Sequence, residues 1–366
     1  MIKKLLIAFL LIIPFLGFSQ NSLLSNQAKA SILTCGTGPE SYAMYGHTGI
    51  RIQDPSTGID VVYNYGAFDF STPNFIGRFV KGDLHYFVTY GNFAEFYYNY
   101  QAENREIIEQ KLTLSSAQIN QLFQQLNASV NSDERFYTYK FIDRNCTTMV
   151  VDKINATLGK EYIKSTTSAL TYREILYPYM SDFYLKLGIQ MIFGAKVDKP
   201  ATRLFLPYEF KKSLSETKIQ GKPIITSTET LLKARKTSLP FSFCNSIYSL
   251  IGALLLLSFI GKKWIQISYC ITAGLLGIFF TIVGVYSLHE EILWNYNILL
   301  FNPLLIAYAW GLWKGNTTTI KLLAKIILGG IVVYILYMLN KVHLQIVWPF
   351  IALHLYWLGK EVLKKN

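Results

Sequence analysis

Cys146 has the surroundings that thiol chemistry requires. It follows Asp143-Arg144-Asn145 and opens a segment in which Val150, Ile154 and Leu158 recur with helical spacing. A thiol at a helix N-terminus has a lowered pKa, because the unpaired backbone N–H groups and the helix dipole favour its anion. The sequence therefore predicts Cys146 as a nucleophile. The alternative is a buried cysteine that only packs.

His47 is the histidine best placed to serve as the partner base. It opens the run 47–52, whose alternation predicts a strand, and a period of two places His47, Gly49 and Arg51 on one face. Gly49 leaves space beside the imidazole. A solvent-exposed histidine at a strand end is the alternative.

Asn64 is predicted to orient the imidazole of His47. The turn residues 54–58 fold the chain back into a second strand, which brings approximately residues 64–66 opposite His47. A side chain that orients the histidine is the third part of Cys/His catalysis. We therefore predict Cys146, His47 and Asn64 as the catalytic residues. Asp69 is a second candidate for the third role, and turn capping is the alternative for both.

Cys35 is the competing thiol. It lies in the apolar run 31–35, which predicts a strand and a packed side chain. In an oxidising compartment it is also able to pair with Cys146. The four cysteines have no paired spacing, which excludes a disulfide-dense scaffold and a cysteine-type zinc site. We expect no metal and no cofactor.

The composition is that of a membrane protein with an exported part. Of the 366 residues 51% are hydrophobic and only 16% are charged, against about 25% charged in an ordinary soluble domain. The excess of 35 basic over 23 acidic residues is spread along the chain, so nucleic acid is not an expected partner.

Three regions follow from the hydropathy pattern. Residues 1–20 carry two lysines and then an apolar run, which predicts a signal peptide or an uncleaved anchor. Residues 21–240 are predicted to form an exported catalytic domain, and residues 241–366 a bundle of about five transmembrane helices. The apolar runs are 243–260, 265–288, 298–313, 320–339 and 345–359.

The charges between these runs predict which loops face outward. Lys262, Lys263 and the basic tail after residue 359 are expected inside, and the acidic loop 289–297 and residues 340–341 outside. His289 and Asn297 therefore lie on the side of the exported domain. With Arg51 and Asp69, they are the residues that we expect to contact a substrate.

The exported region has an α+β pattern. Alternating or apolar runs predict strands at 31–35, 47–52, 61–65 and 84–90. Helical periodicity covers 115–127 and the segment after Cys146, which ends at Gly159 where a C-terminal cap belongs. The aromatic run 86–100 fits an acyl pocket, a membrane interface or core packing.

Several of these motifs resemble one known family, the Lnb lipoprotein N-acyltransferases. The segments that are similar to its exported N-terminal domain and its C-terminal membrane part are Cys35-Gly-Thr-Gly-Pro, Tyr45-Gly-His47-Thr-Gly-Ile-Arg51, Tyr63-Asn64-Tyr-Gly-Ala-Phe-Asp69-Phe70, Pro73-Asn-Phe75, Asn145-Cys146-Thr-Thr148, Trp294-Asn-Tyr-Asn297 and Asn302-Pro303.

A more distant likeness is to circularly permuted papain-like enzymes, including lecithin:retinol acyltransferase. There too a histidine precedes a cysteine that opens a helix, an order that favours Cys146 over Cys35. The relatives often use a second histidine as the third residue, where this sequence has only Asn64.

The resemblance implies an acyltransferase of the inner membrane, multi-pass, with its catalytic domain in the periplasm. It would move an acyl chain from a phospholipid, through a thioester on Cys146, to the α-amine of a diacylglyceryl lipoprotein. A papain-like amidase or peptidase acting on peptidoglycan or membrane-bound peptides is the main alternative. A non-catalytic sensor or scaffold is a third.

Overall fold

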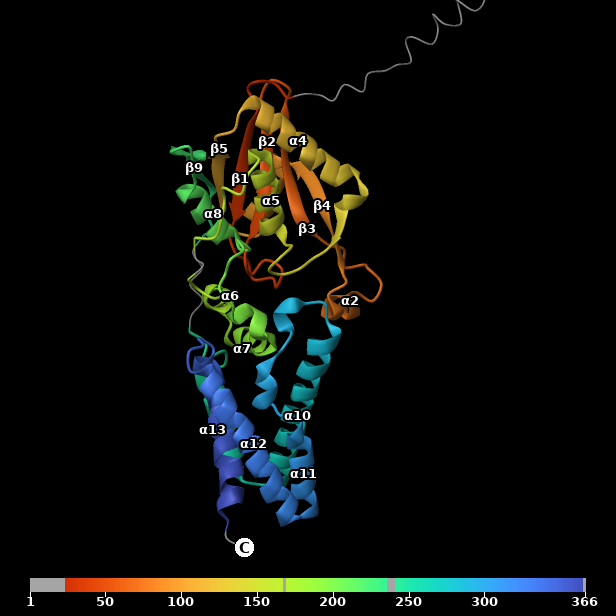
Figure 1. The fold of residues 1–366 in the computed structure, drawn as a ribbon, viewed down its shortest axis with the longest axis vertical. Coiled ribbons are helices and arrows are strands. Elements are labelled where there is room, and N and C mark those ends of the chain that lie inside the picture. Colours follow the sequence, from red (N-terminus) through yellow and green to blue (C-terminus); the bar gives the residue numbers. More distant parts are fainter. Residues whose placement is uncertain (1–23, 167–168, 236–240, 365–366) are drawn as a thin grey trace, which may run out of the picture.

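The computed structural model describes residues 24–166, 169–235 and 241–364. A sheet with its helices forms one end of an elongated molecule, and a bundle of long helices forms the other (Figure 1). The predicted signal peptide at residues 1–20 lies outside the described residues. The α+β class predicted for the exported region is confirmed.

The sheet has seven antiparallel strands in the order β6-β4-β3-β2-β1-β5-β9. Their bounds are β1 Lys29–Cys35, β2 His47–Asp54, β3 Ile59–Ala67, β4 His85–Asn92, β5 Ile107–Leu112, β6 Phe136–Thr138 and β9 Ile225–Leu232. The register pairs Cys35 with His47 and Gly49 with Asn64. The end of the sheet where β2 begins therefore carries both the predicted base and the competing thiol.

Two helices cover one face of this sheet, α4 (Ser116–Asn131) and α5 (Cys146–Leu158). The helix predicted at 115–127 is confirmed as α4, in which Ile119, Leu122 and Leu126 are buried. They share a core with Val150 and Ile154 of α5 and with the inward residues of the strands. The α5 helix ends at Gly159 with φ 72°, the predicted cap.

The opposite face is covered by α3 (Phe93–Ala102), which forms the second half of the aromatic run 86–100. Phe93, Phe96 and Tyr100 pack there against a small cluster that contains Cys35 and Val62. Core packing therefore accounts for this half of the run.

Short elements connect the sheet to the long helices. They are α2 Phe75–Lys81, η2 Asp133–Arg135, α6 Tyr172–Leu176, η3 Tyr177–Tyr179, α7 Phe183–Ile192, η4 Ala195–Asp198, α8 Pro207–Glu216 and the hairpin β7 Lys218–Ile219 with β8 Lys222–Pro223. In Figure 1, α2, α6 and α7 lie between the sheet and the bundle.

The C-terminal third is helical. Its elements are α9 Ile247–Ile260, α10 Lys263–Tyr286, η5 Glu290–Ile292, η6 Tyr296–Leu299, α11 Leu304–Lys314, α12 Thr317–Met338 and α13 Leu344–Leu363. Three stretches of the described residues are long and apolar enough to cross a membrane: Lys263–Tyr286, Glu290–Lys314 and Thr317–Met338. The remaining two of the five predicted spans correspond to α9, which has 14 residues, and to α13, which contains His354 and Lys360.

The segment 287–297 joins the bundle to the rest of the chain. Asn295 and Asn297 donate side-chain hydrogen bonds to the carbonyl oxygen of Met191 at 2.8 and 2.9 Å. Glu290 forms ion pairs with Lys140 at 2.6 Å and with Lys196 at 2.7 Å. The acidic loop expected to face the exported domain therefore contacts it directly, and we call residues 287–297 the latch.

Candidate functional site

Cys146 is the first residue of α5, and the turn around it is fixed by Asn145. The Asn145 side chain accepts hydrogen bonds from the N–H groups of Thr147 and Thr148 at 2.9 and 3.0 Å. It also donates to the carbonyl oxygens of Phe141 and Phe205. In the described part of the chain no hydrogen bond engages the Cys146 N–H, so this turn keeps one open donor beside the thiol.

His47 lies against this thiol and is held from its other side by Asn64. Asn64 Oδ1 is 3.1 Å from His47 Nε2, and the imidazole is near enough to Cys146 to lower the pKa of its thiol. Because Nε2 faces Asn64, Nδ1 is the ring nitrogen left for the sulfur. The three predicted residues are therefore adjacent, and His47 lies between Cys146 and Asn64, as a base between a nucleophile and an orienting side chain would.

The pKa shifts of the pair are those of a thiolate and an imidazolium. Burial raises the pKa of Cys146, but the charge of His47 and hydrogen bonds from His47, the Thr48 N–H and Thr147 bring it below its usual value. Burial likewise lowers the pKa of His47, and the Cys146 charge with the bonds to Cys146 and Asn64 raises it overall. The thiol is half-buried, so a substrate can approach the anion.

Two glycines give the site its shape. A β-carbon on Gly49 would lie 3.3 Å from Asn64 Oδ1 and 3.0 Å from Val62, so the room predicted at Gly49 is room for Asn64. Gly66 has φ +94°, and a β-carbon there would lie 3.7 Å from the β-carbon of Cys146. Only glycine adopts that backbone without strain and leaves the thiol uncovered on this side.

Cys35 has the opposite environment. Its side chain is fully buried under α3 and hydrogen-bonded to Tyr100. Burial raises its pKa to about 12. Cys35 and Cys146 are both free thiols in the structure.

Arg51 and Asp69 are engaged by other residues than Cys146. Arg51 is buried between Asp60 and Glu109, at 2.7 and 3.0 Å, with its guanidinium over the ring of Phe93. Asp69 is exposed and accepts hydrogen bonds from the backbone N–H and the hydroxyl of Ser71. Arg51 is thus bonded to two other strands and Asp69 within its own loop, and their predicted contact with substrate stays a prediction.

His289 and Asn297 both belong to the latch. His289 contacts the carbonyl oxygen of Phe79 at 2.8 Å and the carboxylate of Glu291 at 3.3 Å. Asn297 is fully buried and accepts a hydrogen bond from Tyr334. Their predicted role toward a substrate likewise remains a prediction.

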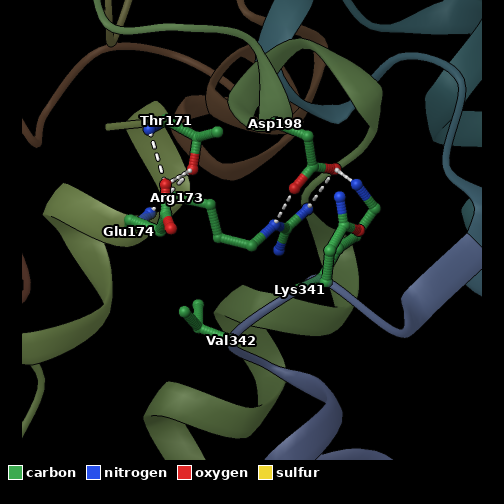
Figure 2. A pocket seen from close by; sticks show the side chains of 7 residues that line it. Thr171, Arg173, Glu174, Asp198, Lys341 and Val342 are labelled. Carbon is green, nitrogen blue, oxygen red and sulfur yellow. Dashed lines mark hydrogen bonds and ion pairs between the residues drawn. The ribbon is translucent and has the colours of Figure 1, made fainter. Parts of the chain in front are cut away.

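A second polar cluster, not predicted from the sequence, is centred on Arg173. Its guanidinium donates to Asp198 at 2.8 Å (Figure 2). It also donates to the hydroxyl of Tyr296 at 3.0 Å. Lys341 approaches the same carboxylate at 3.8 Å from the loop between α12 and α13. Arg173 is 1% exposed. Because Tyr296 and Lys341 belong to the C-terminal helical region, the cluster joins α6 to the bundle. An arginine inside the short apolar helix α6 was the available signal.

No group of three or more histidine, cysteine, aspartate or glutamate side chains able to hold a metal ion occurs among residues 24–166, 169–235 and 241–364.

Residues 17–177 match the family model described as the Lnb N-terminal periplasmic domain. The match covers the sheet through β6, the whole of α5 and all three predicted catalytic residues. No curated protein and no solved structure matches the chain. The matched domain and the three apolar stretches together support an Lnb-like membrane protein with a periplasmic N-terminal domain.

Proposed function

We propose that this protein is a lipoprotein N-acyltransferase that uses Cys146 as its nucleophile. The observation that carries the proposal is the Asn64–His47–Cys146 arrangement, half-buried and latched above apolar helices. The proposal includes a permuted papain-like fold, a multi-pass topology with the three apolar stretches, α9 and α13 as spans, and a location in the inner membrane. The order of His47 on a strand before Cys146 at a helix start supports that fold assignment.

In the first half-reaction the Cys146 thiolate attacks the ester carbonyl carbon of a phospholipid. A C–S bond forms, and the open N–H of Cys146 would donate to the oxyanion. The ester C–O bond then breaks, and the His47 imidazolium gives its proton to the departing alkoxide. The products are an acyl thioester on Cys146 and a lysophospholipid.

In the second half-reaction the α-amine of a diacylglyceryl cysteine attacks the thioester. The C–N bond forms as the C–S bond breaks, and His47 takes the proton that the nitrogen loses. Thiolate and imidazolium are thereby restored. Asn64 keeps the imidazole in the orientation that both transfers need. No cofactor enters this scheme.

Mass spectrometry of one lipoprotein's N-terminal peptide tests the proposal. The comparison uses cells without redundant enzymes that carry the wild type, Cys146→Ala, Cys35→Ala or no protein. We expect the N-acylated peptide with the wild type and with Cys35→Ala only. Identical peptides in all four strains would reject the transferase, and altered peptidoglycan fragments would then favour the amidase.

A further inference from the structure

The helix α2 exposes apolar side chains that nothing in the described chain covers. Ile76 is 77% exposed and Phe79 51%, and Phe70 just before the helix is 67% exposed. No residue of α2 is buried. We call Phe68, Phe70, Phe75, Ile76, Phe79 and Val80 the aromatic lip. Contiguous exposed apolar surface of this kind marks a contact with a partner or a membrane.

The aromatic lip is fixed to the outer end of the apolar helix α10. The Leu288 N–H donates to the carbonyl oxygen of Lys81 at 2.7 Å, and the Ser287 hydroxyl donates to that of Val80 at 2.8 Å. Figure 1 shows α2 beside this end of α10. The apolar surface continues there with Val285, 85% exposed, and Trp294, 84% exposed.

The charges around α2 favour a lipid surface as the occupant. Arg78 is exposed on the helix, and Lys81 lies at its end beside Asp83. Cations beside exposed aromatic rings at the end of a spanning helix are typical of the headgroup region. A bilayer leaflet would cover the lip without any change in the fold.

A row of rings leads from the lip to the thiol. Ring centroids are 6.4 Å apart for Phe79 and Phe75, 5.9 Å for Phe75 and Phe68, and 5.3 Å for Phe68 and Tyr86. Tyr86 then stacks on Tyr139 at 4.4 Å.

The row ends at Gly66, next to Cys146. A β-carbon on Gly66 would lie 3.8 Å from the Tyr139 ring and 3.7 Å from the β-carbon of Cys146. Phe68, Phe75, Tyr86 and Tyr139 are all half-buried, and Phe79 is exposed, so the row has an accessible surface along its length. A hollow of about 640 Å³ borders the row at Phe68 only, and its other lining residues are Asp69, Phe70, Thr72, His85, Phe87, Arg135 and Phe136.

We infer that the aromatic lip lies in the outer leaflet and that this ring row binds the acyl chain of a lipid whose ester or thioester is at Cys146. The inference rests on the proposed function for the identity of the chain. It adds the entry point and the binding surface. Aromatic rings bind methylene chains through the apolar area that is buried and not through the lipid headgroup. Chain length is therefore the property to vary in a test.

Alkylation by maleimides tests the surface without any acyl transfer. The protein in nanodiscs is treated with N-ethylmaleimide or N-dodecylmaleimide, and the rates at Cys146 and Cys244 are read by mass spectrometry. Cys244 is an exposed thiol of the same molecule and corrects for partition of the longer reagent into the lipid. We expect a long-to-short rate ratio at Cys146 at least ~10-fold above that at Cys244.

Phe75→Ser should reduce that ratio toward the value at Cys244, because it interrupts the ring row. Tyr98→Ser removes an aromatic side chain that is 67% exposed on α3, away from the lip, and should leave the ratio unchanged. Equal ratios for the two thiols in the wild type, or no fall in Phe75→Ser, would overturn the inference.

A nitroxide at position 76 tests the depth of the lip. We expect Ile76→Cys, labelled in a Cys146→Ala and Cys244→Ser background, to collide with oxygen more than with a water-soluble nickel complex. A label at Thr57 in the exposed β2–β3 turn should show the reverse. Collision with the nickel complex at both positions would show that the aromatic lip does not lie in the bilayer. If the chain preference holds while lipoprotein peptides are unaffected by Cys146→Ala, the proposed function fails and the ring row stands.

Discussion

Cys146 and Cys35 are two thiols at the same end of one sheet with opposite properties. Both lie near His47, since Cys35 is paired with it across β1 and β2 and Cys146 contacts its ring. Cys35 is enclosed by α3 and its pKa rises to about 12, whereas the pKa of Cys146 is lowered. Proximity to a histidine is therefore insufficient. The helix start, the directed hydrogen bonds and the half-open position distinguish the reactive thiol from the packed one.

The largest expected difference between the two thiols is in acyl transfer. Cys146→Ala should abolish it, a loss of at least ~10³-fold, because the nucleophile itself is removed. Cys35→Ala should change the rate less than ~2-fold. Rates of N-acylation of a lipoprotein peptide by the purified proteins in nanodiscs decide this, and equal losses in the two variants would remove the distinction.

His47→Gln should make the reactivity of Cys146 more like that of Cys35. Without the imidazolium, the pKa of Cys146 rises, because burial still favours the neutral thiol. Each unit of increase lowers the thiolate fraction ~10-fold at pH values below the pKa. The alkylation rate of Cys146 as a function of pH measures this. In the wild type it should reach half its maximum below the ordinary thiol value of 9.0, and in the variant well above the wild-type midpoint.

The same profile contains an internal comparison. The lowered pKa of Cys146 and the raised pKa of His47 are both shifts in the direction that favours a thiolate beside an imidazolium. Cys146 should therefore be alkylated at pH values where an ordinary thiol is still neutral, whereas Cys35 should stay unreactive until the pH nears 12. A wild-type midpoint at the ordinary thiol value would contradict the pairing.

Asn64→Ala is expected to have a smaller effect, a loss of ~10- to 100-fold in kcat with KM nearly unchanged. The imidazole keeps its contact with Cys146 but loses the 3.1 Å bond that orients it. Asn64→Asp serves as the partial rescue, because a carboxylate oxygen can accept the same bond. Full activity in Asn64→Ala would show that Asn64 is not needed to orient His47.

The smallest effect should be on stability alone. Cys35→Ala leaves a small void under α3 and should lower the free energy of unfolding by about 1 kcal/mol. Cys146→Ala, at a half-buried position, should cost less. Thermal unfolding of the two variants in the same detergent gives the comparison, and a larger loss for Cys146→Ala would contradict it.

Much of the site could be predicted because its parts are short-range. The turn at 54–58 fixes the register that brings β3 beside β2, and Asn145 with Gly159 delimits α5. The adjacency of Cys146 to His47 could not follow from such patterns, because it depends on how α5 packs across the sheet. It came instead from the order of residues in resembling enzymes.

Other features had no readable local signal. The edge strand β9 is Ile-Thr-Ser-Thr-Glu-Thr-Leu-Leu, mostly exposed, so its polar residues resembled a linker before the membrane. The Arg173 cluster joins residues more than 100 positions apart. The Glu290–Lys314 stretch is interrupted by short 3₁₀ turns before α11, which the hydropathy of a continuous helix does not reveal.

The latch also sets a height. Its bonds to Met191, Lys81 and Val80 leave the thiol at one level above the bundle, and Gly194 packs so closely on Leu293 that a β-carbon would overlap the Leu293 carbonyl oxygen. Such a joint fixes the distance between the thiol and the bundle. Under the proposed function, an amine anchored in the bilayer at that level would meet Cys146 at a high effective concentration, whereas the amine of a freely diffusing protein would not. The protein would then select its acceptor by the position of the amine relative to the membrane, and not by the protein sequence that follows the amine.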